Sequence, residues 1–339
     1  SDQAETTVTV GNVDPTLTLD TAGSITFPSG LVAFYGESIV PQVHSASAID
    51  EGTDDLTFTW NFGAETTYFN DGSAPDPLLS SDGNLPFGAT DWATIVPPLG
   101  VIEIEVTVTD DDGGSDSASQ TKIVTDTCDC TESKGFWAKQ VDGKKKRGEI
   151  DGSTLGTYLS IITAVSSVFQ GDLALPNVEA ANDVFNPKKG KKGNGSRSDN
   201  GSNSRNASLS GSSSGSNKKK KKKGDKHSGS GSGSGSGSSA TRTPDLSKFK
   251  DKAVQQTLAA WLNFAKGAID WDEEIKISKR ESIAFGDLIA EVESILNNPD
   301  ATKADLKRAE KLAMAVNKHD NKNPDCDTGS GSGSNSGSG

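Results

Sequence analysis

The sequence lacks any hydrophobic run close to the ~20 residues that a membrane-spanning helix needs, and only 32% of its 339 residues are hydrophobic. It opens on the polar stretch SDQAET with no signal peptide, so we expect that a leader has already been removed. The Thr/Ser/Asp/Gly-rich composition is typical of exported proteins. These features predict an extracellular or cell-surface location without a membrane span.

Histidine is scarce, and no catalytic set can be assembled around it. His44, His227 and His319 have no serine and aspartate partners in an order typical of hydrolases. The chain also lacks the G-x-x-x-x-G-K phosphate loop, the H-E-x-x-H motif and a Cys/His metal spacing. The sequence therefore predicts that the protein is not an enzyme.

Cysteine is also scarce, with Cys128, Cys130 and Cys326 as the full set. Three cysteines without a nearby histidine do not complete a closed zinc site. A disulfide from Cys128 or Cys130 to Cys326 would stabilise the fold by roughly 3–5 kcal/mol in the loop-entropy model. It would indicate an oxidising compartment, and it would leave one cysteine that is free, mixed or bonded to another chain.

Basic residues are almost absent from the first part of the chain. Up to Thr131 there are 22 acidic residues and one basic residue, Lys122, whereas residues 187–242 hold 14 Lys and Arg. An acidic domain of this kind argues against nucleic acid as its ligand. The basic segment leaves anionic partners open.

Short alternating strands fill the acidic part. Leu56, Phe58, Trp60 and Phe62 fall on one face of their segment, and the stretch from Ile102 to Val108 alternates in the same way. Period-two patterns separated by polar turns predict an all-β antiparallel sandwich.

The segments DLTFTWNFG and VIEIEVTVTDDDGGSDSASQTKIV resemble a polycystic-kidney-disease (PKD) repeat, an Ig-like β-sandwich, over about residues 13–127. Residues 60–63 (WNFG) match its signature. The usual Asp-Gly that follows is replaced by residues 64–65 (AE), and the insert over residues 66–98 is long. The resemblance implies an extracellular spacer or adhesive unit and not a catalyst.

The stretch VTVTDDDGGSDS allows three interpretations: a calcium loop, a catalytic carboxylate cluster or an acidic turn. Gly113 and Gly114 permit the positive φ of a tight hairpin turn. Nothing beside the cluster completes a catalytic set, and the spacing differs from that of an EF-hand. We therefore interpret the stretch as an acidic turn. If calcium is a cofactor, we expect its ligands to be Asp110, Asp112 and Asp116.

Residues 1–12 hold a further strand and a linker, with the alternating sequence Thr7, Val8, Thr9 and Val10. Three outcomes are open for this strand. It pairs within its own sheet, it belonged to a preceding repeat that has been trimmed away, or it adds to the sheet of a neighbouring subunit and so builds a fibre.

The remaining ordered part, residues 128–186 plus 243–326, has a helical pattern. Apolar residues recur at three- and four-residue steps over about residues 154–170, 245–266, 282–297 and 301–318. Four such helices packed together predict a small all-α bundle. Among its tryptophans, Trp137, Trp261 and Trp271 suit either a carbohydrate platform or, as we interpret them, core packing.

This part resembles, more loosely, a helical module of secreted and surface-anchored prokaryotic proteins. The match rests on the sequence Gly-Phe-Trp-Ala-Lys at residues 135–139 and on LAAWLNFAKGAI at residues 258–269. The resemblance implies a location outside the cell and no activity.

Residues 187–242 interrupt the helical module with a Ser/Gly/Lys-rich insertion that we expect to be disordered. The insertion is either a solvated spacer or a basic arm that binds an acidic neighbouring copy or an anionic polysaccharide. Asn194, Asn200 and Asn206 within it are candidate glycosylation sites. Residues 327–339 are predicted to be a flexible tail.

Two hypotheses about function result. The first is an exported structural or adhesive surface protein that contacts other copies of itself or other surface proteins, with a filament joined by its N-terminal strand. The second is a carbohydrate- or surface-binding accessory region of a larger secreted enzyme.

Overall fold

The computed structural model describes residues 11–52, 54–63, 67–68, 78–79, 87–127, 130–143, 150–187 and 246–319. The chain up to Pro187 and the chain from Leu246 form one compact unit. Several predicted features lie outside the described residues: Thr7, Val8, Thr9 and Val10, Cys128, Cys326, the three sequons, and nearly all of the insertion.

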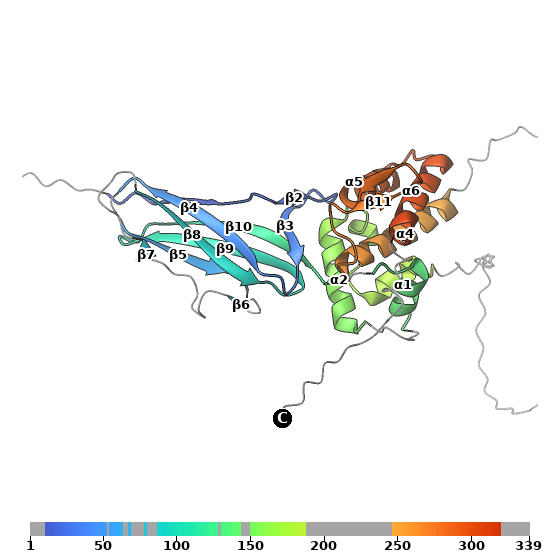
Figure 1. Ribbon diagram of the computed structural model, residues 1–339, viewed down its shortest axis with the longest axis horizontal. Helices are drawn as coiled ribbons and strands as arrows, with labels where there is room; N and C mark the ends of the chain where they lie inside the picture. The colour runs from blue at the N-terminus through green and yellow to red at the C-terminus, as the bar shows by residue number, and fades with distance from the viewer. Residues whose placement is uncertain are drawn as a thin grey trace, which may run out of the picture. The chain divides into compact units, whose positions relative to one another are not determined.

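The acidic part of the chain forms two stacked sheets, whose long strands β4, β8, β9 and β10 are seen in Figure 1. The first sheet has the order β1-β4-β8-β6, with the bounds Thr16–Leu19, Gln42–Asp50, Phe87–Val96 and Thr67–Tyr68. The second sheet has the order β2-β3-β10-β9-β5-β7, with the bounds Ile25–Thr26, Val32–Glu37, Ser115–Thr125, Gly100–Asp110, Leu56–Asn61 and Leu78–Leu79.

This strand order is that of an Ig-like sandwich. Strands β1, β4, β8 and β6 take the places of A, B, E and D in an Ig domain, and β5, β9 and β10 take those of C, F and G. All pairs are antiparallel except β3 with β10. Trp60 on β5 is buried, and its Nε1 donates to Oδ2 of Asp91 on β8 at 2.9 Å, which joins the two sheets.

The alternation read from the sequence is confirmed in this sandwich. Leu56, Phe58 and Trp60 on β5 face the core, as do Ile104, Val106 and Val108 on β9. The residues between them, such as Glu103 and Glu105, face outward. A strand with one buried face stabilises the fold through these apolar side chains, each contributing roughly 1.5–3 kcal/mol when fully buried.

Six helices make up most of the second part of the chain, and Figure 1 shows them grouped around α4. Their bounds are Lys134–Val141 (α1), Gly152–Val165 (α2), Val178–Phe185 (α3), Ser247–Ala265 (α4), Phe285–Asn297 (α5) and Lys303–Val316 (α6). Helix α4 contacts each of the other five, and eleven of its residues are buried. Within the described ranges, none of the helices combines the length and apolar character that a membrane span requires.

The expectation of a sandwich followed by a separate all-α bundle is only partly correct. Strands β11 (Glu274–Lys276) and β12 (Ser282–Ala284) form a hairpin among the helices, so the helix predicted from residue 282 begins at Phe285. The helical core also continues into the sandwich, because Phe27, Ala33 and Ile123 belong to the same buried cluster as the helices. The fold is therefore mixed α and β, with the two parts sharing a core.

Hydrogen bonds cross the same boundary. The Tyr35 hydroxyl donates to Asp270 at 3.0 Å, and the Tyr158 hydroxyl donates to Asp126 at 2.6 Å. The backbone N–H of Asp126, just after β10, donates to the carbonyl of Ala265 at the end of α4 at 3.1 Å. The end of the last strand is thus attached to two helices.

Candidate metal centre and exposed surfaces

Three carboxylates meet at one end of the sandwich. Strand β4 ends at Asp50 and strand β9 ends at Asp110, and Asp54 lies in the segment that leads into β5. Because β5 begins opposite the end of β9, with Leu56 paired to Asp110, these segments share one end of the fold. One oxygen from each of the three carboxylates lies within 4.8 Å of the others.

The hairpin turn between β9 and β10 fixes the position of Asp110. Its Oδ1 accepts the N–H of Gly114 at 2.7 Å, and its Oδ2 accepts Nδ2 of Asn12 at 2.9 Å. Gly113 has φ +93°, as a three-residue hairpin turn requires. A Cβ atom on Gly114 would lie 2.4 Å from Oδ2 of Asp110 and 2.7 Å from Oδ1 of Asp14, so a larger residue there would require both carboxylates to move. The predicted tight turn is confirmed.

Asp50 is the least satisfied member of the cluster. Its side chain is fully buried, with 0% exposure, and Oδ1 accepts the N–H of Gly52 at 2.5 Å. Oδ2 is buried and has no hydrogen-bond partner. A buried carboxylate oxygen without a partner costs free energy unless a ligand satisfies it.

The local charge is strongly negative. The pKa of the Asp54 carboxyl is raised, first by its partial burial and then by the surrounding carboxylates, in the order Asp50, Asp112, Asp111 and Asp110. A raised pKa means that these negative charges repel one another in the absence of a cation. A cation placed there would relieve this repulsion.

The fold separates the three aspartates that the sequence suggested as calcium ligands. Asp110 belongs to the cluster, and Asp112 is near enough to contribute to the raised pKa of Asp54. Asp116 is used elsewhere, because its Oδ2 accepts the N–H of Leu17 at 2.9 Å and so holds β1 beside β10. Sequence reasoning missed Asp50 and Asp54, which precede Asp110 by more than fifty residues.

The geometry fits Ca²⁺. Calcium binds oxygen ligands at 2.3–2.6 Å, so two oxygens on the same ion are separated by about 5 Å at most, and three oxygens within 4.8 Å of one another can reach the same ion. Asp50, Asp54 and Asp110 offer hard carboxylate oxygens, which calcium prefers. Backbone carbonyls and water would supply the remaining ligands of a six- to eight-coordinate ion.

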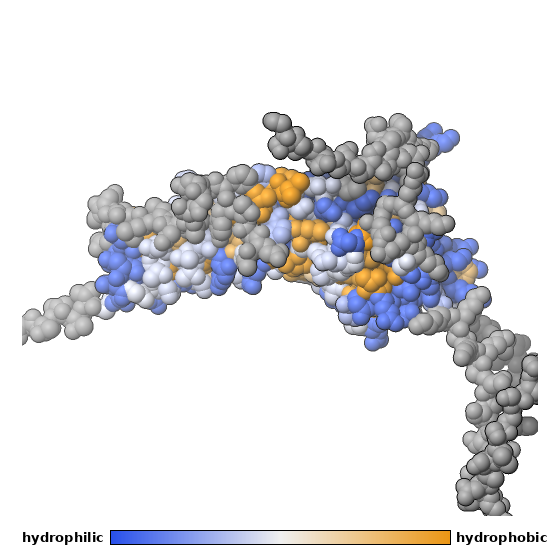
Figure 2. All heavy atoms as spheres, turned by 90° about the horizontal axis from the view of Figure 1, so that it is seen from below, coloured by the Kyte–Doolittle hydropathy of each residue, from blue (hydrophilic) through white to orange (hydrophobic). Residues whose placement is uncertain are grey.

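The outer face of the first sheet carries no charge on β1, β4 or β8. Its outward residues are Thr16, Thr18, Val43, Ser45, Ser47, Ile49, Gly88, Thr90, Trp92 and Thr94. Trp92 is 56% exposed and lies opposite Ser45 in the register of β4 and β8. On the face shown in Figure 2, much of the sandwich is likewise pale, the colour of weakly polar residues. An uncharged strip with an exposed indole is suited to contact with another surface.

The tryptophans predicted to pack in the core do so. Trp137 and Trp261 are fully buried, and Trp271 is partly buried against the same cluster. The indole of Trp137 donates to Oδ1 of Asn263 at 3.0 Å. The three tryptophans therefore do not form a carbohydrate platform, whereas Trp92, which the sequence did not single out, is exposed.

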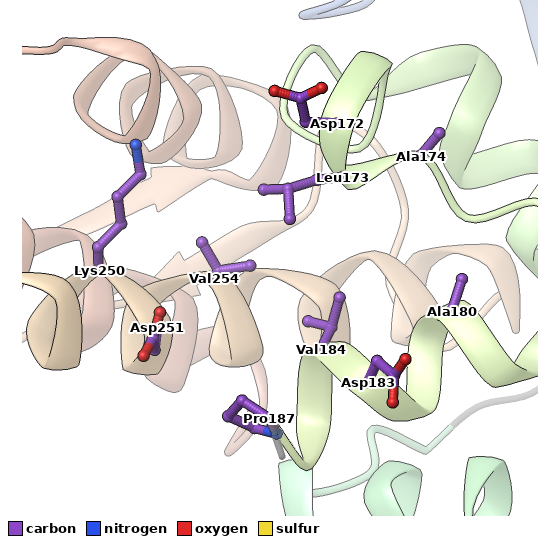
Figure 3. Close-up of a pocket in the computed structure, with 10 residues that line it drawn as sticks. All are labelled: Asp172, Leu173, Ala174, Ala180, Asp183, Val184, Pro187, Lys250, Asp251 and Val254. Atoms are coloured by element: carbon purple, nitrogen blue, oxygen red, sulfur yellow. The ribbon is translucent and has the colours of Figure 1, made fainter. Parts of the chain in front are cut away.

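A cleft of about 490 Å³ lies between α3, the start of α4 and the short helix Gly171–Leu173. Figure 3 shows Leu173, Val184 and Val254 lining its apolar floor from these three elements, with Asp172 and Asp251 beside it. Lys250 lines the same cleft, so charges of both signs surround the apolar floor.

Cys130 takes part in a disulfide bond. Its two candidate partners, Cys128 and Cys326, lie outside the described residues, so the pairing stays a prediction. Close by, the hydroxyl of Thr131 donates to the carbonyl of His319, which brings the start and the end of the helical part together.

Comparison with protein-family models and with curated proteins gave no match. Solved structures that resemble part of the chain include a PapD-like domain of human CEP192, at 13% identity over 38% of this chain and 96% of that chain with a TM-score of 0.23. A family 123 glycoside hydrolase from Clostridium perfringens matches at 10% identity over 38% of this chain and 32% of that chain, with a TM-score of 0.23. The secreted serine protease VesC from Vibrio cholerae matches at 8% identity over 34% of this chain and 25% of that chain, with a TM-score of 0.20. Similarities at these scores carry no functional argument.

Proposed function

We propose that this chain is an exported, non-catalytic structural or adhesive protein of the cell surface, whose β-sandwich binds a calcium ion. The observation that carries the proposal is the fully buried Asp50, which has one oxygen without a hydrogen-bond partner and whose carboxylate lies beside those of Asp54 and Asp110. A divalent cation would satisfy that oxygen and balance the three negative charges at the same time.

Calcium binding at this cluster supports a location outside the cell. Three carboxylates completed by water and carbonyl oxygens make a site of modest affinity, and extracellular calcium modules bind with dissociation constants of about 10⁻⁴–10⁻³ M. We further propose that the sandwich is a PKD repeat, because residues 60–63 carry the WNFG signature at the end of β5.

Two features of the first sheet support contact with other copies or with other surface proteins. Its outer face is uncharged on β1, β4 and β8, so two acidic domains can approach there with least repulsion. In addition, β6 pairs with β8 only at Thr67 and Tyr68, and among the described residues the rest of that edge of β8 has no strand partner. An added strand, such as residues 7–10 of a neighbour, would pair at such an edge.

The basic insertion offers a further contact in this proposal. Its 14 Lys and Arg would attract the acidic sandwich of a neighbouring copy, or an anionic polysaccharide. Both partners are anionic, and both contacts would weaken as salt is added.

Calcium is expected to stabilise the fold. With a dissociation constant of about 10⁻⁴–10⁻³ M, about 5 mM calcium adds roughly 1–2 kcal/mol to the free energy of unfolding. That corresponds to a rise of roughly 2–8 °C in the thermal midpoint of a fold of this size. Calorimetry of the full chain with calcium, and then with excess chelator, measures the effect.

Asp50→Asn separates metal binding from folding. The amide keeps the shape and the oxygen that accepts from Gly52, so the variant should fold without calcium and show no calcium response. Glu103→Gln is the matched control, because it removes one negative charge from the exposed side of β9, seven residues from Asp110. Equal calcium shifts in both variants would contradict the site.

Filament formation is expected to depend on the N-terminal strand. Electron microscopy of the full chain should show filaments, and a variant without residues 1–10 should show none. This deletion keeps Asn12, so its hydrogen bond to Asp110 and the acidic cluster remain intact.

One other outcome would favour the alternative function, a carbohydrate- or surface-binding accessory region. The observation behind that alternative is the exposed Trp92 on an uncharged face, because aromatic side chains bind the apolar faces of ligands. A monodisperse monomer that binds glycans, and loses them on Trp92→Ala, would replace the filament proposal.

A further inference from the structure

A cavity of about 230 Å³ lies between the two sheets of the sandwich, beside the turn that follows β1. Lys122 on β10 and His44 on β4 line it from the two opposite sheets. Phe34, Asp20 and Ser45 also line the cavity. The cavity lies at a different end of β4 from the acidic cluster, because β4 runs from Gln42 to Asp50.

Lys122 is a buried cation without a counter-charge. Its side chain is only 2% exposed, and its Nζ lies 5.7 Å from the centre of the Phe34 ring. No described residue forms an ion pair with it. Burial lowers the pKa of Lys122 to about 8, so most molecules still carry the charge at pH 7. A buried charge of this kind is costly unless something compensates it.

His44 also lines this cavity. Its ring lies 4.8 Å from that of Phe34, and its buried Nε2 has no hydrogen-bond partner. Burial, and then the charge of Lys122, lower the pKa of His44 to about 4, so the imidazole is neutral at pH 7 and can donate from one nitrogen.

The one carboxylate in the lining does not serve as the counter-charge. Asp20 accepts the N–H of Ala22 at 2.9 Å through Oδ1 and the Ser45 hydroxyl at 3.1 Å through Oδ2. Its two oxygens are therefore used to hold the turn after β1 against β4. Asp20 keeps its negative charge but forms no ion pair with Lys122, so the ammonium has no bonded counter-charge among the described residues.

We propose that this cavity binds a small carboxylate anion, which accepts a hydrogen bond from Nζ of Lys122. A carboxylate offers acceptors only, which matches the ammonium donor, and its single charge balances that of Lys122. A neutral ligand would leave the lysine uncompensated, and a metal cation would be repelled by it. This binding depends neither on the acidic cluster nor on filament formation.

Acetate is the probe, and acetamide, which has nearly the same shape without the charge, is the control. Titration of the full chain at constant ionic strength, followed by NMR of the Lys122 and His44 side chains, should show saturable shifts with acetate. Acetamide should bind at least about tenfold more weakly, because it lacks the charge-assisted bond.

Lys122→Met tests the assignment to this lysine. The substitution keeps the length of the side chain and removes the charge, and it should weaken acetate binding by about tenfold or more. Lys248→Met, which removes the same charge from an exposed position on α4, should leave acetate binding unchanged. If Lys122→Met does not fold, the comparison of acetate with acetamide on the unmodified chain decides.

Three results would overturn the proposal. The first is the absence of saturation by acetate, and the second is unchanged acetate binding in Lys122→Met. The third is binding of phosphate or sulfate without binding of acetate, which would assign the cavity to a different anion.

Discussion

Replacing Gly267 with alanine is expected to lower the free energy of unfolding by roughly 3–5 kcal/mol. Gly267 ends α4 with φ +74°, a conformation that costs an L-residue about 1 kcal/mol or more. In addition, a Cβ atom would lie 1.7 Å from the carbonyl oxygen of Asp126 and 2.6 Å from its carbonyl carbon. Both are backbone atoms, which cannot rotate away as a side chain can.

The expected loss is large because the obstructed atoms belong to the link between sandwich and helices. Moving Asp126 away would stretch two hydrogen bonds. One is donated by the N–H of Asp126 to the carbonyl of Ala265 at 3.1 Å, and the other is donated by the Tyr158 hydroxyl to the Asp126 carboxylate at 2.6 Å. Each hydrogen bond contributes about 1 kcal/mol on its own. The substitution therefore combines backbone strain, steric overlap and the loss of bonds between the two parts.

Gly143→Ala is the matched control for this prediction. Gly143 also follows a helix with positive φ, at +65°, but no atom lies within 4 Å of the position of its Cβ. Gly143→Ala should lower the free energy of unfolding by about 1 kcal/mol, which is the cost of the backbone strain alone. Chemical denaturation of both variants measures the difference, and similar losses would show that the contact with Asp126 is unimportant.

The sandwich could be predicted from the sequence because its signal is local. In β5 and β9 each residue faces either the core or solvent, so alternation such as Phe58, Thr59 and Trp60 records burial directly. Helices α2 and α4 are long enough, at 14 and 19 residues, to display their apolar face. Thr302 and Asp305 form a capping box at the start of α6, which is a local pattern as well.

The elements that the sequence did not predict are short. Helices α1 and α3 have eight residues each, and α1 buries only Trp137 and Val141. Two turns of helix are too few for a periodic pattern, and such helices owe their stability to tertiary packing. Strands β11 and β12 have three residues each, which is too short for alternation to be recognised.

The candidate sites required the topology of the sheets. Asp50 and Asp110 are brought together because β4 and β9 end on the same side of the sandwich, which no local pattern encodes. Lys122 stands out in the sequence as a basic residue among acidic ones. Its burial opposite His44 follows from the parallel pairing of β10 with β3 and the stacking of the two sheets.

Replacing Glu293 with alanine is expected to cost roughly 3–5 kcal/mol of stability. Glu293 lies on α5, is 1% exposed, and accepts hydrogen bonds from α4 and from the segment that directly follows α2. Trp261 of α4 donates through Nε1 at 2.7 Å, and Ser167, just after α2, donates through its N–H and its hydroxyl at 2.7 Å each. The hydroxyl of Ser166 donates as well.

The cost arises mainly from the donors that the substitution leaves behind. An indole N–H and a backbone N–H in the core would lose their acceptor, and each unsatisfied buried donor costs about 1–3 kcal/mol. The cavity left by the removed side chain adds to this. Three helices would lose their common attachment point, so we expect the helical part to unfold at a lower denaturant concentration.

Glu291→Ala on the same helix is the control. Glu291 accepts from Arg308 at the surface, where an ion pair contributes about 0–1 kcal/mol. Denaturation followed by the fluorescence of the buried tryptophans should therefore show a large loss for Glu293→Ala and a small one for Glu291→Ala. A Glu293→Leu variant more stable than the unmodified chain would show that the carboxylate serves specificity and not stability. Leucine removes the desolvation cost of the buried carboxylate together with its hydrogen bonds.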